Sequence, residues 1–242
     1  MSHAITRHLA LSIAMALLAG CSQSDAPSAT AASPAPVTKP VFTVLGIDRT
    51  AGNAMARQGL AIAHGYVLAA KPCDRLQLRW ISDRSFVSSE VIGDLRLPCL
   101  PKPAAEFDAA ATRRYVLASK AIQVSRRDAI AALDAYAAKT LAATRSSDLV
   151  GFIAATSTSF ADAPEYDHAL AIISDFEDNA KRSATVDLDQ ATVTMHLVGE
   201  QADPERAQAL TTAWSDALKK MGAASVRLRS EAPEPYLPAT SR

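Results

Sequence analysis

Short apolar runs alternate along the chain with longer segments in which apolar side chains recur every three or four residues. The runs are typical of β-strands, and the longer segments are typical of amphipathic α-helices. We expect strands over residues 41–48, 74–83, 168–174, 191–198 and 224–228, and a short antiparallel edge strand over 86–97. We expect helices over 54–70, 104–143, 149–160 and 204–221, of which the second is one long helix or two.

The order of these elements predicts the fold class. The run 168–174 is apolar throughout, as in a strand that is buried on both faces. Strands that alternate with helices favour a parallel sheet with helices packed against it. We therefore predict an α/β fold with a doubly wound, mostly parallel sheet, helices on both faces and one antiparallel edge strand.

The N-terminal residues 1–21 have the features of a targeting segment. Arg7 precedes an apolar run, 9–18, that is too short to span a bilayer, since about 20 residues are needed. The run ends in Leu18-Ala19-Gly20-Cys21, which resembles the lipobox of bacterial lipoproteins. The resemblance implies cleavage before Cys21, lipidation of Cys21 and, with Ser22 next to it, a place on the periplasmic face of the outer membrane. A plain signal peptide or a short hydrophobic N-terminus is the alternative.

The rest of the chain divides by composition. Residues 22–40 are rich in Ser, Ala, Pro and Thr, and they offer too little apolar surface to fold, so we expect a disordered linker. Residues 41–230 form the predicted domain. Residues 231–242 are polar and contain proline, which predicts a loose C-terminal tail.

Charge and hydrophobicity narrow the classes of function. The formal net charge is zero and the pI is near 7.0, whereas nucleic-acid binding usually requires a basic surface. We therefore expect no nucleic-acid partner. Hydrophobic residues make up 49% of the chain, which excludes global disorder.

The chain has two cysteines in addition to Cys21, namely Cys73 and Cys99. An even pair in an oxidising compartment favours a disulfide, and an antiparallel hairpin between them would bring both to the same end of the sheet. A redox or metal pair is the alternative, although the chain has no Cys-x-x-Cys motif.

The first predicted strand ends at Asp48, and Thr50 follows in a polar loop. In an open α/β sheet, ligands bind at the carboxyl ends of such strands. The order of elements, together with the segments 47–52, 147–149 and 173–179, resembles a von Willebrand factor A (VWA) domain over about residues 41–230. That resemblance implies a doubly wound sheet with one antiparallel edge strand.

The same resemblance implies a metal-ion-dependent adhesion site, in which a partner's carboxylate often completes the shell of a Mg²⁺ ion. The matching positions are Asp48, Thr50, Ser147 and Asp175, while Gly52 stands where a second serine is expected. Mn²⁺ or Ca²⁺ are the other hard cations that oxygen ligands suit. Alternatively, these acids cap helices and bond loop amides, and no metal binds.

We expect a membrane-anchored module of the cell envelope that binds a protein partner or ligand and is not an enzyme. The chain has no Gly-x-Ser-x-Gly, Walker or His-Glu-x-x-His motif. A metal-assisted hydrolase and a purely structural assembly domain without metal are the alternatives. The arginines in the long helix form an anion-binding face or an ordinary solvated face; they are Arg113, Arg114, Arg126 and Arg127.

Overall fold

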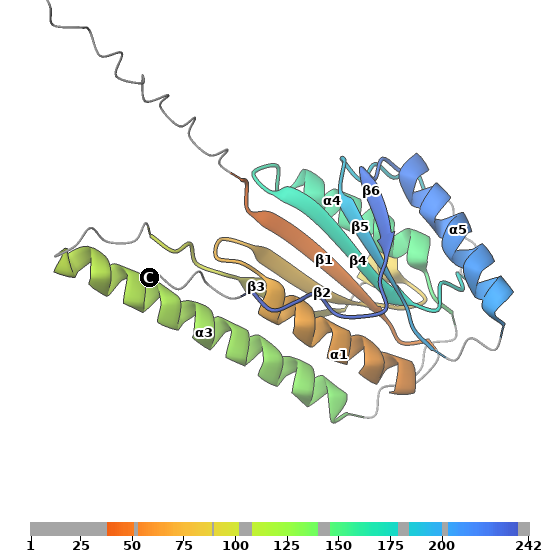
Figure 1. Cartoon of the computed structure of the whole chain (residues 1–242). Coiled ribbons are helices and arrows are strands. Elements are labelled where there is room, and N and C mark those ends of the chain that lie inside the picture. Colours follow the sequence, from red (N-terminus) through yellow and green to blue (C-terminus); the bar gives the residue numbers. More distant parts are fainter. Residues whose placement is uncertain are drawn as a thin grey trace, which may run out of the picture. The chain divides into compact units, whose positions relative to one another are not determined.

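A single six-stranded sheet organises the domain (Figure 1). Its strand order is β3-β2-β1-β4-β5-β6, and every neighbouring pair is parallel except β2 and β3, which are antiparallel. The strands are β1 Val41–Asp48, β2 Arg75–Ile81, β3 Val91–Arg96, β4 Asp167–Ser174, β5 Thr192–Leu197 and β6 Ser225–Leu228. The predicted mostly parallel sheet with one antiparallel edge strand is therefore confirmed.

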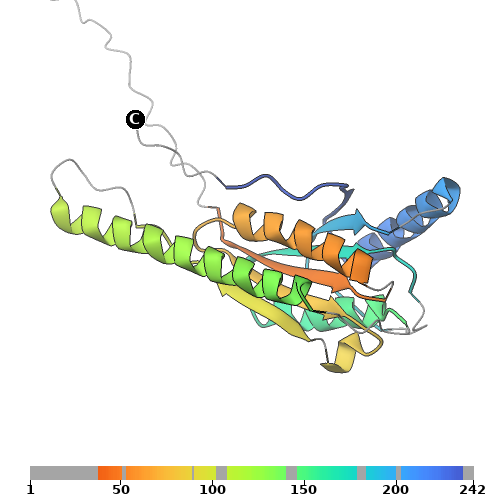
Figure 2. The same cartoon turned by 90° about the horizontal axis from the view of Figure 1, so that it is seen from below.

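Helices cover both faces of the sheet, as predicted (Figures 1 and 2). On one face α1 (Asn53–Ala69) and α3 (Ala109–Ala137) enclose a core that includes Trp80. On the other face α4 (Leu149–Ala161) and α5 (Pro204–Lys220) enclose a second core, which includes Phe152. The buried aromatic side chains thus lie in two cores that otherwise consist mainly of Leu, Ile, Val and Ala.

This computed structural model describes residues 38–50, 53–88, 90–101, 108–139, 146–178, 184–199 and 203–236. The predicted signal peptide, the predicted lipidation site Cys21, the predicted linker up to residue 37 and Gly52 lie outside these ranges. Within the described ranges, no helix combines the length and the apolar character that crossing a bilayer requires.

The segment 86–97 differs from its prediction. The strand β3 begins only at Val91, and a short helix, α2 (Ser85–Ser88), precedes it. The Ser85 hydroxyl accepts a hydrogen bond from the amide of Ser82 and donates one to its carbonyl, at 2.9 and 3.0 Å, which closes a tight turn after β2. Phe86 and Val87, whose apolar character suggested a strand, lie exposed on this turn.

The long helical segment forms one helix, α3, over 29 residues. Its arginines do not form a common anion-binding face, because Arg126 has a structural role. The guanidinium of Arg126 donates to the carbonyl of Ala70, beyond the end of α1, and lies 5.8 Å from the ring centroid of Tyr236. Arg127 instead pairs with its neighbour Asp128 at 3.0 Å.

Residues 231–236 of the predicted tail are packed, and residues 237–242 lie outside the part of the chain that the structure describes. Residues up to 236 lie against α1 rather than being loose: Ala232 packs on the core, and the amide of Tyr236 donates to the carbonyl of Leu68 at 3.0 Å. Gly65 allows this approach, because a Cβ at that position would lie 2.3 Å from the Cβ of Ala232. The contact is thus made by small residues, Gly65 and Ala232, which do not stand out as apolar positions in the sequence.

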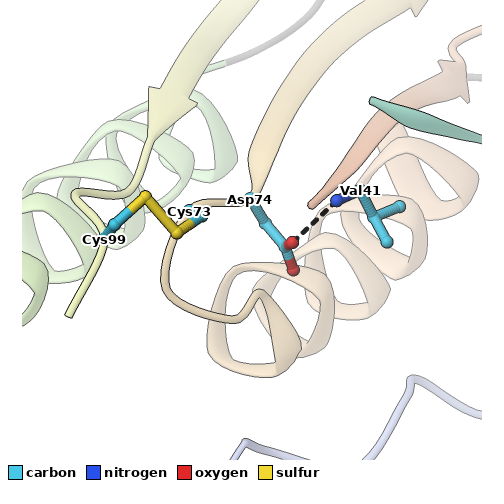
Figure 3. The surroundings of a disulfide bond; sticks show 4 residues. All are labelled: Val41, Cys73, Asp74 and Cys99. Carbon is cyan, nitrogen blue, oxygen red and sulfur yellow. Dashed lines mark hydrogen bonds between the residues drawn. A yellow bond between two sulfur atoms is a disulfide. The ribbon is translucent and has the colours of Figure 1, made fainter. Parts of the chain in front are cut away.

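The predicted disulfide between Cys73 and Cys99 is confirmed (Figure 3). It joins the turn before β2 to the turn after β3, because the antiparallel pairing brings these two ends together. Next to it, the carboxylate of Asp74 accepts a hydrogen bond from the amide of Val41 at 2.9 Å. This corner therefore fixes the first residue of β1 as well as the hairpin.

Candidate functional site

The candidate site lies where the sheet order reverses direction. The strands β2 and β3 lie on one side of β1, and β4, β5 and β6 lie on the other. In such a sheet the crossover connections leave a crevice at the carboxyl ends of the two central strands. The register pairs Ile47 with Ile173, so Asp48 and Ser174 end neighbouring strands at this crevice.

The carboxylate of Asp48 is fully buried and accepts four contacts from this chain. Its Oδ1 accepts from the amide and the hydroxyl of Thr50, at 2.9 and 2.8 Å. Its Oδ2 accepts from the hydroxyls of Ser147 and Ser174, both at 2.7 Å. The buried charge is thus held by oriented hydrogen bonds, which offset part of its desolvation cost.

The hydroxyls of Thr50 and Ser147 have fewer protons than the hydrogen-bond contacts that they make with each other and with Asp48. The hydroxyl oxygens of Thr50 and Ser147 lie 2.8 Å apart, and each also lies within hydrogen-bond distance of Asp48. Each hydroxyl has a single proton to donate, so two protons face three short oxygen–oxygen contacts. One of the three contacts therefore has no proton of its own, and a cation bound by both hydroxyl oxygens would stabilise their close approach.

Asp175 adds a second acid beside this network. Its Oδ1 accepts from the amide of Glu177 at 3.0 Å. Burial raises the pKa of Asp175 above its ordinary value, and the negative charges of Asp48 and Glu177 raise it further. Glu177 itself pairs with Arg206 of α5 at 2.7 Å. The carboxyl ends of β1 and β4 therefore carry acids that a bound cation would favour in their charged forms.

The structure brings together Asp48, Thr50 and Ser147 from two distant loops, as predicted, and places Asp175 next to them. Sequence reasoning missed Ser174, which donates directly to Asp48 and also accepts from the amide of Phe176 at 2.9 Å. Ser174 comes directly before Asp175, the aspartate that the resemblance implied. Only the register between β1 and β4 shows that it lies beside Asp48.

The donor atoms at this site fit a hard divalent cation. All are carboxylate or hydroxyl oxygens, which Mg²⁺ accepts while it keeps several waters. Within the described residues, no group of three or more His, Cys, Asp or Glu side chains is placed to hold a metal. A cation here would therefore rest on the hydroxyls of Thr50 and Ser147 as much as on the acids Asp48 and Asp175.

Comparison with known proteins gives a similarity in structure and none in sequence. No protein-family model matches the chain, and no curated protein matches its sequence. Among solved structures, a von Willebrand factor type A protein from Catenulispora acidiphila is similar, with a TM-score of 0.44 and 13% sequence identity. The alignment covers 79% of this chain and 39% of that chain, so this chain spans well under half of that structure.

The VWA-like fold itself rests on the sheet described above. The resemblance in the sequence implied a doubly wound sheet with a single antiparallel strand at its edge, and the observed order and pairing have that form.

Two buried histidines have structural partners within the fold. The ring of His168 stacks on Phe160 with 4.5 Å between centroids, and its Nε2 lies 3.0 Å from the carbonyl of Ala163. The Nε2 of His196 lies 2.9 Å from the hydroxyl of Tyr66. His196 is 1% exposed, so it has no access to a substrate in solution.

The burial of His196 predicts a pH-dependent stability. Burial lowers the pKa of His196 to about 4, and the charge of Arg229 adds to the effect, whereas an unfolded histidine titrates near 6.5. The unfolded chain therefore binds the proton first as the pH falls below 6.5. Stability is full above that pH, and by pH 5 the free energy of unfolding falls by about 2 kcal/mol.

Urea unfolding between pH 7.5 and 5 measures this loss. The double variant Tyr66→Phe/His196→Phe removes the titrating ring and its hydroxyl partner together, and we expect a flatter pH dependence for it. The same pH slope in the double variant and in the parent chain would contradict the assignment to His196.

Proposed function

We propose that this protein is a binding module of the cell envelope, anchored by lipid at Cys21, whose strand-end site holds a divalent cation. The cation would bind an acidic group of a partner protein or ligand, and no catalysis takes place. The lipobox-like segment 18–21 and the linker after it support the anchor and a place on the periplasmic face of the outer membrane.

One observation carries the cation site: the hydroxyls of Thr50 and Ser147 crowd together on the buried carboxylate of Asp48 with one proton too few. Asp175 lies beside them, and its pKa is raised by burial and by the negative charges of Asp48 and Glu177. A divalent cation would balance these charges and leave an open coordination position for a carboxylate. Asp48, Thr50, Ser147 and Asp175 would hold it.

Isothermal titration of the full chain with Mg²⁺, Mn²⁺ and Ca²⁺, after treatment with EDTA, tests the site. We expect saturable binding of at least one cation. Asp175→Ala is expected to weaken it by about tenfold or more, since a carboxylate is a main part of the affinity. Asp48→Asn removes charge while it keeps the shape of the buried side chain, and we expect a similar loss.

Asp216→Ala is the matched control, because Asp216 is an exposed carboxylate on α5 away from the strand ends. Circular dichroism of each variant shows whether it is folded. The absence of heat with all three cations, or equal affinity in Asp175→Ala and the control, would overturn the proposal. Crosslinking in envelope membranes with and without EDTA then tests the partner, whose capture should depend on the cation.

A further inference from the structure

The helix α3 extends past the end of the sheet at which β1 begins (Figures 1 and 2). Arg126 of α3 donates to the carbonyl of Ala70, shortly before Asp74 in the chain. Asp74 in turn accepts from the amide of Val41, the first residue of β1, so Arg126 lies near the amino end of β1. The part of α3 before Ile122, its first buried residue, lies beyond this end and is about 20 Å long, at a rise of about 1.5 Å per residue.

The outer side of this part of α3 combines apolar and basic side chains. Five residues at helical spacing lie on the side opposite the buried Ile122, and we call them the outer face: Arg113, Val116, Leu117, Lys120 and Val124. The three apolar side chains are 44%, 57% and 45% exposed, in chain order, and both basic residues are exposed. Exposed apolar side chains among basic ones are typical of a helix that lies on a membrane surface.

The charge around the outer face is positive. The sequence has no acidic residue between Asp108 and Asp128, although the formal net charge of the chain is zero. Asp108 caps α3 by accepting from the amide of Ala111, and Asp128 pairs with Arg127 at 3.0 Å. The outer face therefore complements a negatively charged surface.

This charge disfavours a second copy of the chain as the occupant. In a symmetric pair, the same surface of both copies meets. Two outer faces would bring Arg113 and Lys120 of one copy close to the same residues of the other, without an acidic side chain on the face to pair with them. Like charges at such spacing are destabilising.

The position of the outer face favours a lipid bilayer as the occupant. The predicted linker, residues 22–37, joins Cys21 to Thr38, which lies just before β1. A flexible linker of this length spans roughly 20–25 Å on average, which is comparable to the length of α3 beyond the sheet. A domain anchored through Cys21 would therefore hold the outer face within reach of the membrane.

We propose that the outer face of α3 binds the surface of a bilayer that contains anionic lipid, and thereby orients the domain on the membrane. Val116 and Leu117 enter the interface, while Arg113 and Lys120 bind anionic headgroups. The proposal rests on the anchor at Cys21 proposed above, and it is independent of the cation site.

Fluorescence quenching in vesicles tests the outer face. The full chain carrying Leu117→Trp is purified from membranes in detergent and reconstituted into vesicles whose lipids are brominated in the acyl chains. One set of vesicles contains phosphatidylcholine alone, and the other also contains phosphatidylglycerol. The parent chain gives the signal of Trp80 and Trp214, which is subtracted. We expect the new tryptophan to be quenched in the anionic vesicles and not in the neutral ones, and high salt to remove the quenching.

Charge reversal distinguishes this contact from general adsorption. Arg113→Glu/Lys120→Glu should lower the quenching at least about fivefold, since even one basic residue near an anionic surface changes the binding constant by about that factor. Lys219→Glu/Lys220→Glu makes the same change of charge on α5, which covers the other face of the sheet, and should leave the quenching unchanged. Unchanged thermal midpoints show that the variants are folded. Equal quenching in neutral and anionic vesicles, or an equal loss in both charge variants, would overturn the proposal. The absence of quenching in these protein-free vesicles would overturn it in favour of a protein partner.

Mass spectrometry and flotation test the anchor separately. Lipid on Cys21 and flotation with the neutral vesicles would support the anchor alone. Quenching in the anionic vesicles without lipid on Cys21 would contradict the anchor and support the outer face. A chain that carries lipid and shows no quenching would overturn the outer face and leave the anchor intact.

Discussion

Replacement of Gly46 by alanine is expected to lower the free energy of unfolding by about 3 kcal/mol. Gly46 lies in the middle of β1, one of the two central strands, and α4 packs directly on it. A Cβ at this position would lie 2.4 Å from the Cζ of Phe152 and 2.9 Å from the Cδ1 of Ile81. Both side chains are fully buried, so neither can move without disturbing the core, and overpacking of this kind costs about 1–3 kcal/mol or more.

Thermal and urea unfolding measure this effect. For a domain of this size, a loss of about 3 kcal/mol lowers the thermal midpoint by roughly 6–12 °C. Gly93→Ala is the matched control, because its Cβ would meet Leu78 at 3.9 Å and should change stability little. Equal midpoints for Gly46→Ala and Gly93→Ala would show that α4 does not pack on β1 as described.

Loss of the disulfide is expected to have a comparable effect. The bond joins residues separated by 26 positions, and closure of a loop of that length constrains the unfolded chain by about 3.5 kcal/mol. The variant Cys99→Ser should therefore unfold at a clearly lower urea concentration than the parent. Because β3 depends on this hairpin, hydrogen exchange at Val91–Arg96 should also become faster.

Reductant supplies the control for this prediction. It should destabilise the parent chain by the same amount as the substitution, and it should leave the double variant Cys73→Ser/Cys99→Ser unchanged. A parent chain whose urea midpoint is insensitive to reductant would contradict a stabilising role for the bond.

The sheet could be predicted from the sequence because its strands are local patterns. Val41–Asp48 and Asp167–Ser174 are apolar runs that end in polar residues, and each long amphipathic segment connects two of these strands. The disulfide was predicted from the expected oxidising compartment and the expected hairpin. Asp48, Thr50 and Ser147 could be placed together because parallel strands end at one edge of the sheet.

The errors arose where specific contacts, local or long-range, override the hydrophobic pattern. Phe86 and Val87 are residues typical of a strand, but the side chain of Ser85 closes a turn here. The spacing of apolar residues does not indicate such a hydrogen bond. Ser174 joins the site through a register that only the folded sheet fixes. The tail packs through Ala232 on Gly65, and such small residues do not predict a packed segment from their hydrophobicity.

The path of β1 has a mechanical consequence. Its first residue, Val41, is held at the corner beside the disulfide, and its last residue, Asp48, lies at the centre of the candidate site. If the chain is tethered through its N-terminus, tension between the tether and a bound partner runs along this one strand. Parallel neighbours hold β1 on both sides, so the load shears both ladders together instead of unzipping them bond by bond. Under such a load, the domain would resist unfolding by a force that acts between its tether and its ligand.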